Sequence, residues 1–416
     1  MAHDPAPVRK ATSVGLVPIG GQEPWRPSAD GLADCVRACL RARQDPAALD
    51  ALRAALGSGQ ATWEALLCQL ADARLDGLVY PVLNDAPWTP PAMLAELRQA
   101  HARYAVANTI LLAAFADAAR KLTAAGIPTL ALKGAALVES VYDSLGQRPM
   151  NDLDILVPAG QAAAAAALLL ADGYRWAAPT DLAAALEFEN ELMLRRPGPI
   201  DTVIELHWHL INAPYYQRRL PMDWFWQTSR PLQVGGVATR TLGPEAQMLY
   251  LCAHLVLHHG QQRDLELRLL ADIAAVLRLA GPVDRAIDWD LVLRQAQAWD
   301  LVIALQRALS QAASRLGAPV PEAVLEALGR LRPSDAERAV VAAMTAPDPS
   351  VAARFRADMA GLSGARARLR FIARNVFPSA DYMRQRYSED GVGLPRAYLR
   401  RWWLGLSGAV RSLGRR

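Results

Sequence analysis

Apolar residues recur at helical spacing over most of the chain. Leu66 and Leu70 are four residues apart, and Leu111, Leu112 and Phe115 continue the same three- to four-residue interval. Such spacing places apolar side chains on one face of a helix. We therefore predict helices from about residue 29 to 125, and again from about residue 243 onward.

The pattern changes between these two helical regions. Three short apolar runs, at residues 129–132, 152–157 and 202–210, have the length and alternation of β-strands, and a helix is expected over residues 135–145. Mixed strands and helices of this kind indicate a compact α/β unit. The predicted fold class is α+β, in which a small α/β core is flanked by N- and C-terminal helical regions.

Changes in composition suggest where the segments begin and end. Five prolines and three glycines fall within the first 28 residues, which opposes regular structure there. We predict a flexible leader over 1–28, an N-terminal helical region over 29–125, an α/β core over 126–242, a helical domain over 243–360 and a basic C-terminal tail over 361–416.

Charge is distributed unevenly along the chain. The 416 residues are 52% hydrophobic and 21% charged, the balance of a folded protein, and carry a net charge of +4. Residues 364–416 contain twelve arginines and only three acidic residues, so the rest of the chain is net acidic. The charge therefore gives no support to a nucleic acid as the substrate. The basic, aromatic tail is interpreted first as a solvated or protein-facing helix and second as a surface for an anionic membrane.

Cysteine usage and hydropathy bear on the compartment. The four cysteines are scattered and include no Cys-x-x-Cys pair, so neither a disulfide framework nor a zinc site is expected. The longest alanine and leucine run, residues 162–171, is too short to cross a bilayer, and the first thirty residues lack the apolar core of a secretory signal. We predict a cytoplasmic protein without a transmembrane segment.

The strongest chemical signal is Asp152-Leu153-Asp154 on a predicted strand. Alternation along a strand puts the two carboxylates on one face, roughly 7 Å apart. Glu205 and His207 share one face of the later strand in the same way. If the two strands are neighbours, three carboxylates converge, and Mg²⁺ would relieve their repulsion. A solvated strand edge without chemistry is the alternative.

Candidate phosphate-binding residues lie upstream. Lys133 and Gly134 stand at the start of a predicted helix, where backbone N–H groups and the helix dipole favour phosphate. Arg148, just before Asp152, could donate two hydrogen bonds to phosphate oxygens. We predict that Lys133, Gly134 and Arg148 hold a triphosphate.

A pair of histidines forms a second, weaker candidate. His254 and His258 are four residues apart, which places both imidazoles on one face of a helix. This spacing occurs in helical zinc sites, but the intervening glutamate of a metalloprotease is missing, so we interpret them, together with His207, as groups that line the cleft or support the metal ligands.

Together these motifs resemble the uncharacterised nucleotidyltransferase family of the polymerase-β-type superfamily. The resemblance rests on residues 132–137, Tyr142, Arg148, residues 152–157 and residues 205–208, with tail motifs at 378–387 and 394–398. It implies a glycine-containing turn before an Asp-x-Asp strand, with the third metal ligand on a later acidic strand. Asp152, Asp154 and Glu205 are then the catalytic and metal-binding residues, with a two-ion Mg²⁺ site.

The implied activity is the Mg²⁺-dependent transfer of a nucleoside monophosphate from an NTP, such as ATP, to a hydroxyl group. The acceptor could be a small molecule, a sugar or a peptide. Two alternatives stay open: a non-catalytic binding or scaffold protein that retains the fold, and a phosphotransferase that uses the same site.

Overall fold

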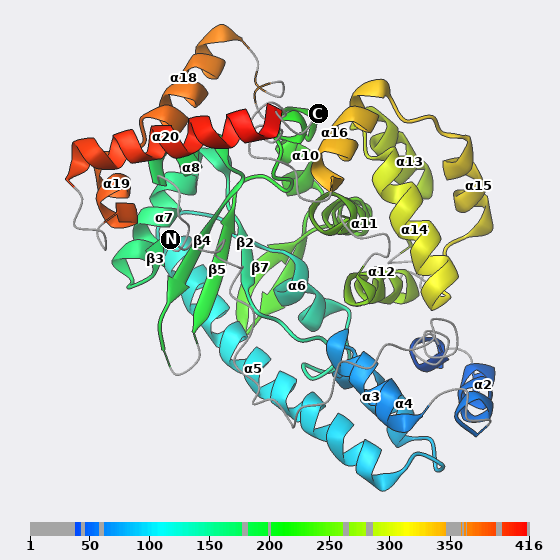
Figure 1. Cartoon of the computed structure of the whole chain (residues 1–416). Coiled ribbons are helices and arrows are strands. Elements are labelled where there is room, and N and C mark those ends of the chain that lie inside the picture. Colours follow the sequence, from blue (N-terminus) through cyan, green and yellow to red (C-terminus); the bar gives the residue numbers. More distant parts are fainter. Residues whose placement is uncertain are drawn as a thin grey trace.

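The computed structural model contains a mixed β-sheet surrounded by helices (Figure 1). It describes residues 38–42, 46–57, 62–176, 182–198, 201–260, 266–279, 286–346, 359, 362, 364–387 and 393–413, although the side chains beyond residue 403 are outside the description. The leader predicted over residues 1–28 lies outside these described residues. The α+β class is confirmed: a small sheet-containing core is flanked by helices that precede and follow it in sequence.

In the described part of the chain the sheet has seven strands in the order β3-β4-β5-β2-β1-β7-β6. The pairs β2 with β5 and β1 with β7 are parallel, whereas the other neighbours are antiparallel. The strand bounds are β1 Leu130–Ala131, β2 Leu153–Leu156, β3 Arg175–Trp176, β4 Glu191–Arg196, β5 Thr202–His207, β6 Arg230–Val234 and β7 Val237–Thr241.

The long helix α5 supports the sheet. It spans Pro91–Ala124 and packs against β2, β6 and β7 as well as α7. Its buried side chains include Leu111, Leu112 and Phe115, the residues whose spacing predicts a helix there. This helix therefore forms one wall of the hydrophobic core beneath the sheet.

The remaining helices before and within the sheet region are shorter. Pro81 lies inside α4, which continues through it. The bounds are α2 Pro46–Gly57, α3 Trp63–Asp72, α4 Asp76–Asn84, α6 Lys133–Ser140, the 3₁₀ turn Ala159–Gln161, α7 Ala162–Ala171, α8 Leu182–Phe188, α9 Pro214–Arg219 and α10 Met222–Gln227.

After the sheet the chain is helical again. The bounds are α11 Pro244–Ala253, a π-helical turn His254–His258, α12 Leu267–Leu279, α13 Trp289–Ala298, α14 Val302–Leu316, α15 Glu322–Arg330, α16 Asp335–Thr345, α18 Ala365–Val376, α19 Ala380–Tyr387 and α20 Leu394–Leu413. Among the described residues, none of these helices has the length and apolar character needed to cross a bilayer.

The helices on the two sides of the sheet segment share one hydrophobic core. Leu66 and Leu70 of α3 belong to the same cluster of buried residues as Leu270 of α12 and Leu305 of α14. Burial of apolar surface is the main stabilising term in folding, so this shared cluster ties the N-terminal helices to the later ones. Strand β2 is supported by this shared cluster in addition to the core beneath the sheet.

Candidate functional site

The two acidic strands are neighbours, as the site hypothesis requires. β2 and β5 run parallel, and the register pairs Asp154 with Glu205 and Leu156 with His207. Residues two apart on a strand face the same side, so Glu205 and His207 lie on one face beside Asp154. Asp154 is almost completely buried, at 1% exposure. The alternation along both runs and the pairing of the two strands together produce this convergence.

Three potential metal ligands meet at this point. One ligand atom from each of Asp154, Glu205 and His207 lies within 4.8 Å of the other two. Two of these residues are in the set expected from sequence, whereas His207 was expected to support the ligands. Asp152, one residue before β2, is outside this group of three.

Asp152 is nevertheless electrostatically part of the site. Burial, together with the nearby carboxylates of Asp154 and Glu205, raises the pKa of its carboxyl to about 6 against the opposing charge of Lys133. A carboxyl that is costly to ionise in this way gains from a nearby cation. The charge of Asp152 therefore depends on the charges of Asp154 and Glu205, and its role in cation binding stays a prediction.

Lys133 lies among the carboxylates. Its Nζ atom is 2.6 Å from Asp154 Oδ1 and 3.4 Å from Glu205 Oε2. Burial alone would lower the pKa of Lys133, but these carboxylates raise it well above its ordinary value, so the ammonium is charged. The residue begins α6 directly after β1 and has φ of 42°, in the left-handed region that non-glycine residues seldom adopt. Such strain is concentrated at functional sites.

His207 bridges the cluster to a further carboxylate. Its Nε2 atom is 2.9 Å from Asp154 Oδ1, and its Nδ1 atom is 3.1 Å from Glu191 Oε2, an ion-pair contact without ideal hydrogen-bond geometry. Burial would lower the pKa of His207, but the charge of Glu191 and the contact with Asp154 raise it well above its usual value. The imidazolium therefore holds Asp154 in place through one nitrogen.

Sequence reasoning missed Glu191. It opens β4 and pairs with His207 across the antiparallel β4–β5 ladder. Burial would raise the pKa of Glu191, but His207 lowers it to about 2, so this carboxylate is ionised. The only available signal was the alternation of the short run Glu191–Arg196, which is weak without knowledge of its pairing.

Arg148 is engaged in a buried ion pair. Its Nε and Nη2 atoms donate to the carboxylate of Asp272 on α12, at 3.0 and 2.8 Å, and the Tyr142 hydroxyl donates to the same carboxylate at 2.7 Å. Burial alone would lower the pKa of Arg148, and Asp272 more than offsets this. The guanidinium thus joins the sheet region to the later helices, and its contact with phosphate stays a prediction.

The ion pair between Arg148 and Asp272 requires a residue without a side chain at Gly134. A Cβ atom placed there would lie 2.7 Å from Arg148 Nη1 and 2.9 Å from Met150 Cγ. Side-chain carbon does not fit at such distances, so the absence of a side chain lets the guanidinium pack against α6. This steric role exists alongside the phosphate-binding role expected for Gly134.

His254 and His258 lie in the π-helical turn after α11, with ring centroids 5.2 Å apart. Burial lowers the pKa of both, that of His254 well below its ordinary value and that of His258 to about 4. The charge of Lys133 contributes to both shifts, which indicates that these neutral rings lie near the site. Neither belongs to the cluster of potential metal ligands found among the described residues.

Tyr250 is a second residue that the sequence did not reveal. Its hydroxyl is buried and has no hydrogen-bond partner within the described structure. Burial raises its pKa to about 12, opposed by the charges of Lys133 and His207. A buried hydroxyl without a partner is costly, and one beside the cluster can donate a hydrogen bond to a bound group.

Comparisons with known proteins identify the family of this chain. No curated protein matches this chain significantly. Among solved structures, an antigenic nucleotidyltransferase-like protein from Paracoccidioides brasiliensis aligns over 53% of this chain and 96% of its own, with 18% identity and a TM-score of 0.33. A family described as uncharacterised nucleotidyltransferase matches residues 59–317, more than half of the chain, including β2, β5 and Lys133. The chain therefore belongs to this uncharacterised nucleotidyltransferase family.

Proposed function

We propose that the chain is a Mg²⁺-dependent enzyme that transfers a nucleoside monophosphate from an NTP to a hydroxyl group of a small molecule, sugar or peptide. The observation that carries the proposal is the convergence of Asp154, Glu205 and His207 on two paired strands, beside Lys133. Family membership supports nucleotidyl transfer as the reaction class.

The residues present fit a hard divalent cation. Asp152, Asp154 and Glu205 supply carboxylate oxygens, the ligands that Mg²⁺ prefers. With Glu191, four carboxylates face only two cationic side chains, Lys133 and His207. An excess of buried negative charge favours the binding of a cation. His207 is protonated by its two acidic neighbours, so we assign it to holding Asp154 and Glu191 rather than to coordination.

Lys133 and the start of α6 have the phosphate-binding role in this proposal. Lys133 would place its ammonium against a phosphate oxygen, and the N–H groups at the start of α6 would face the triphosphate. When bound, Mg²⁺ would neutralise phosphate charge and stabilise the leaving pyrophosphate. The acceptor oxygen forms a bond to the α-phosphorus while the bond to pyrophosphate breaks, and the hydroxyl proton passes to a carboxylate of the cluster.

Transfer of label tests the reaction type. The purified chain is incubated with Mg²⁺, a metabolite extract and an NTP labelled at either the α- or the γ-phosphate. Nucleotidyl transfer predicts that the α-label enters product while the γ-label leaves as pyrophosphate. Entry of the γ-label alone would instead identify a phosphotransferase, and no transfer with no NTP binding would support the scaffold alternative.

Variants connect the reaction to the site. Asp152→Asn combined with Asp154→Asn should lower transfer by at least about a hundredfold, because the charges that bind the cation are lost. Asp201→Asn is the matched control, since Asp201 is an exposed carboxylate just before β5 that pairs with Arg195. Full activity in the double variant would overturn the assignment of these carboxylates.

A further inference from the structure

Exposed large hydrophobic side chains are concentrated in the C-terminal helices. Of those found in the described part of the chain, three lie elsewhere, Val106, Ile110 and Leu168. The other five define what we term the C-terminal surface: Leu369, Ile372, Phe377, Leu399 and Trp403. Leu399 is 61% exposed and Trp403 is 68% exposed. A concentration of this kind on a folded protein marks an interaction site.

The two helices that carry most of this surface are positively charged. Helices α18 and α20 contain several arginines and no acidic residue. On α20, Leu399 and Trp403 are one turn apart, and Arg396 and Arg400 are one turn apart beside them, all exposed. On α18, Arg366 and Arg368 are also exposed. The surface therefore combines apolar and positively charged groups on the same helical faces.

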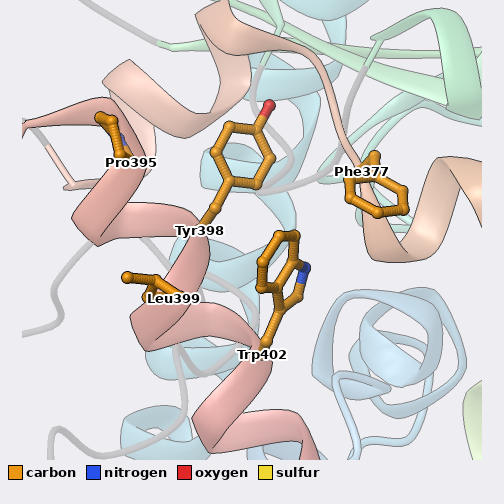
Figure 2. Close-up of a pocket in the computed structure, with 5 residues that line it drawn as sticks. All are labelled: Phe377, Pro395, Tyr398, Leu399 and Trp402. Carbon is orange, nitrogen blue, oxygen red and sulfur yellow. The ribbon is translucent and has the colours of Figure 1, made fainter.

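A shallow apolar hollow opens within this region. Its volume is ≈ 340 Å³, and Figure 2 shows Phe377 facing Tyr398 and Trp402 across it, with Pro395 and Leu399 on the same helix. The polar ends of the aromatic residues are already satisfied: the Tyr398 hydroxyl donates to Pro378 O at 2.5 Å, and Trp402 Nε1 donates to Val376 O at 2.7 Å. Only carbon therefore lines the hollow.

We propose that the C-terminal surface docks the protein peripherally on an anionic lipid bilayer. Tryptophan and leucine would enter the boundary between headgroups and acyl chains, while the arginines would contact lipid phosphates. Nucleic acid would satisfy the arginines but would leave the apolar side chains against a charged backbone. The positive charge of α18 and α20 favours an anionic surface over a neutral one.

Docking would orient the nucleotidyltransferase site. Helix α18 packs on α8, with Phe371 and Phe188 in edge-to-face contact at 5.2 Å and Arg370 paired with Glu187 at 3.2 Å. Glu191, which holds His207, follows α8 by only three residues. Figure 1 shows α18 and α20 on the same side of the sheet as α8. The proposal does not depend on the reaction, because it concerns a surface outside the carboxylate cluster.

Vesicle flotation with the full chain tests this proposal. We expect at least tenfold more protein on vesicles with about 30 mol% phosphatidylglycerol than on pure phosphatidylcholine, and release at high salt. Leu399→Ser with Trp403→Ser should lower binding about tenfold or more. Both side chains are largely exposed, so the fold should persist, and circular dichroism verifies this.

The chain contains a closely matched control. Val106 and Ile110 are also exposed and one turn apart, but they lie on α5. Val106→Ser with Ile110→Ser should leave vesicle binding unchanged.

The arginines are tested separately. Arg396→Gln with Arg400→Gln should weaken binding to anionic vesicles, whereas substitution of two exposed arginines elsewhere, Arg98→Gln with Arg294→Gln, should not. Absent binding, equal binding to neutral vesicles, or equal effects of the two apolar pairs would overturn the proposal. Binding to RNA that is insensitive to Leu399→Ser with Trp403→Ser would also overturn it.

Discussion

At the scale of single residues, the site is a set of charges that neutralise one another incompletely. Lys133 and His207 each contact Asp154 Oδ1, at 2.6 and 2.9 Å, so one buried carboxylate receives two cationic donors. Glu205 and Asp152 lie beside them with weaker compensation. Because these groups are buried, their interactions are stronger than on the surface, and the binding of a cation or a phosphate alters them all.

Gly134 gives a residue-scale prediction. Gly134→Ala should destabilise the protein by about 1–3 kcal/mol, because the new methyl group must displace the Arg148 guanidinium or the Met150 side chain. Denaturant unfolding measures this difference. Gly329→Ala is the control: Gly329 also lies inside a helix, but no atom lies within 4 Å of its added Cβ. That substitution should be neutral or slightly stabilising, and an equal cost at both positions would refute the steric role of Gly134.

At the scale of elements, several helices are fastened by buried polar contacts. Arg148 and Asp272 join the sheet region to α12. Glu337 of α16 plays a similar part, since its Oε1 atom accepts a hydrogen bond from Ile303 N at the first turn of α14, at 2.6 Å. A carboxylate suits a helix N-terminus, but Glu337 is fully buried and its Oε2 has no partner within the described structure.

This burial makes stability depend on pH. Burial, helped by the charge of Asp300, raises the pKa of Glu337 to about 7. Between its ordinary value and about 7 the folded state binds the proton of Glu337 more tightly than the unfolded state, so the contribution of Glu337 to stability is fully present at low pH and falls as pH rises through this window. Glu337→Gln should remove this component and be more stable than the wild type at pH 8 by about 1–3 kcal/mol.

Unfolding at pH 5 and pH 8 provides the measurement. The difference in unfolding free energy between the two conditions should shrink in Glu337→Gln, whereas Glu322→Gln, at an exposed position of α15, should retain it. An unchanged pH dependence in Glu337→Gln would show that another group is responsible.

Local patterns predicted part of this site, and long-range pairing supplied the rest. The alternation around Asp154 and Glu205 identified two strands, and their adjacency is confirmed. The ion pair between Arg148 and Asp272 joins residues 124 positions apart, so no local pattern could reveal it. Glu191 was missed because its role arises only when β4 pairs with β5.

The type of helix formed by residues 254–258 also could not be predicted from local patterns. The spacing of His254 and His258 predicts an α-helical face, but the structure has a π-helical turn there. Leu255 and Val256 of this turn are buried, and helical periodicity does not encode contacts with distant parts of the chain. The phosphate-binding roles of Lys133, Gly134 and Arg148 remain predictions, as does the segment map of the chain.

At the scale of the whole molecule, the acidic cluster and the basic helices lie on different elements. The sheet carries a cluster of acidic groups that could hold a metal ion, whereas α18 and α20 carry arginines and no acid. The net charge of +4 is thus the sum of an acidic body and a basic end. Helix α8 connects the two, since it contacts α18 and leads into β4.

The most direct test of the central claim is calorimetric titration of a non-hydrolysable NTP analogue into the full chain, with and without Mg²⁺. We expect binding that requires Mg²⁺ in the wild type and in Asp201→Asn, and a loss of at least about tenfold in affinity in Asp152→Asn combined with Asp154→Asn. Binding that is independent of Mg²⁺, or unchanged in the double variant, would contradict the assignment of this carboxylate cluster as a metal-dependent nucleotide site.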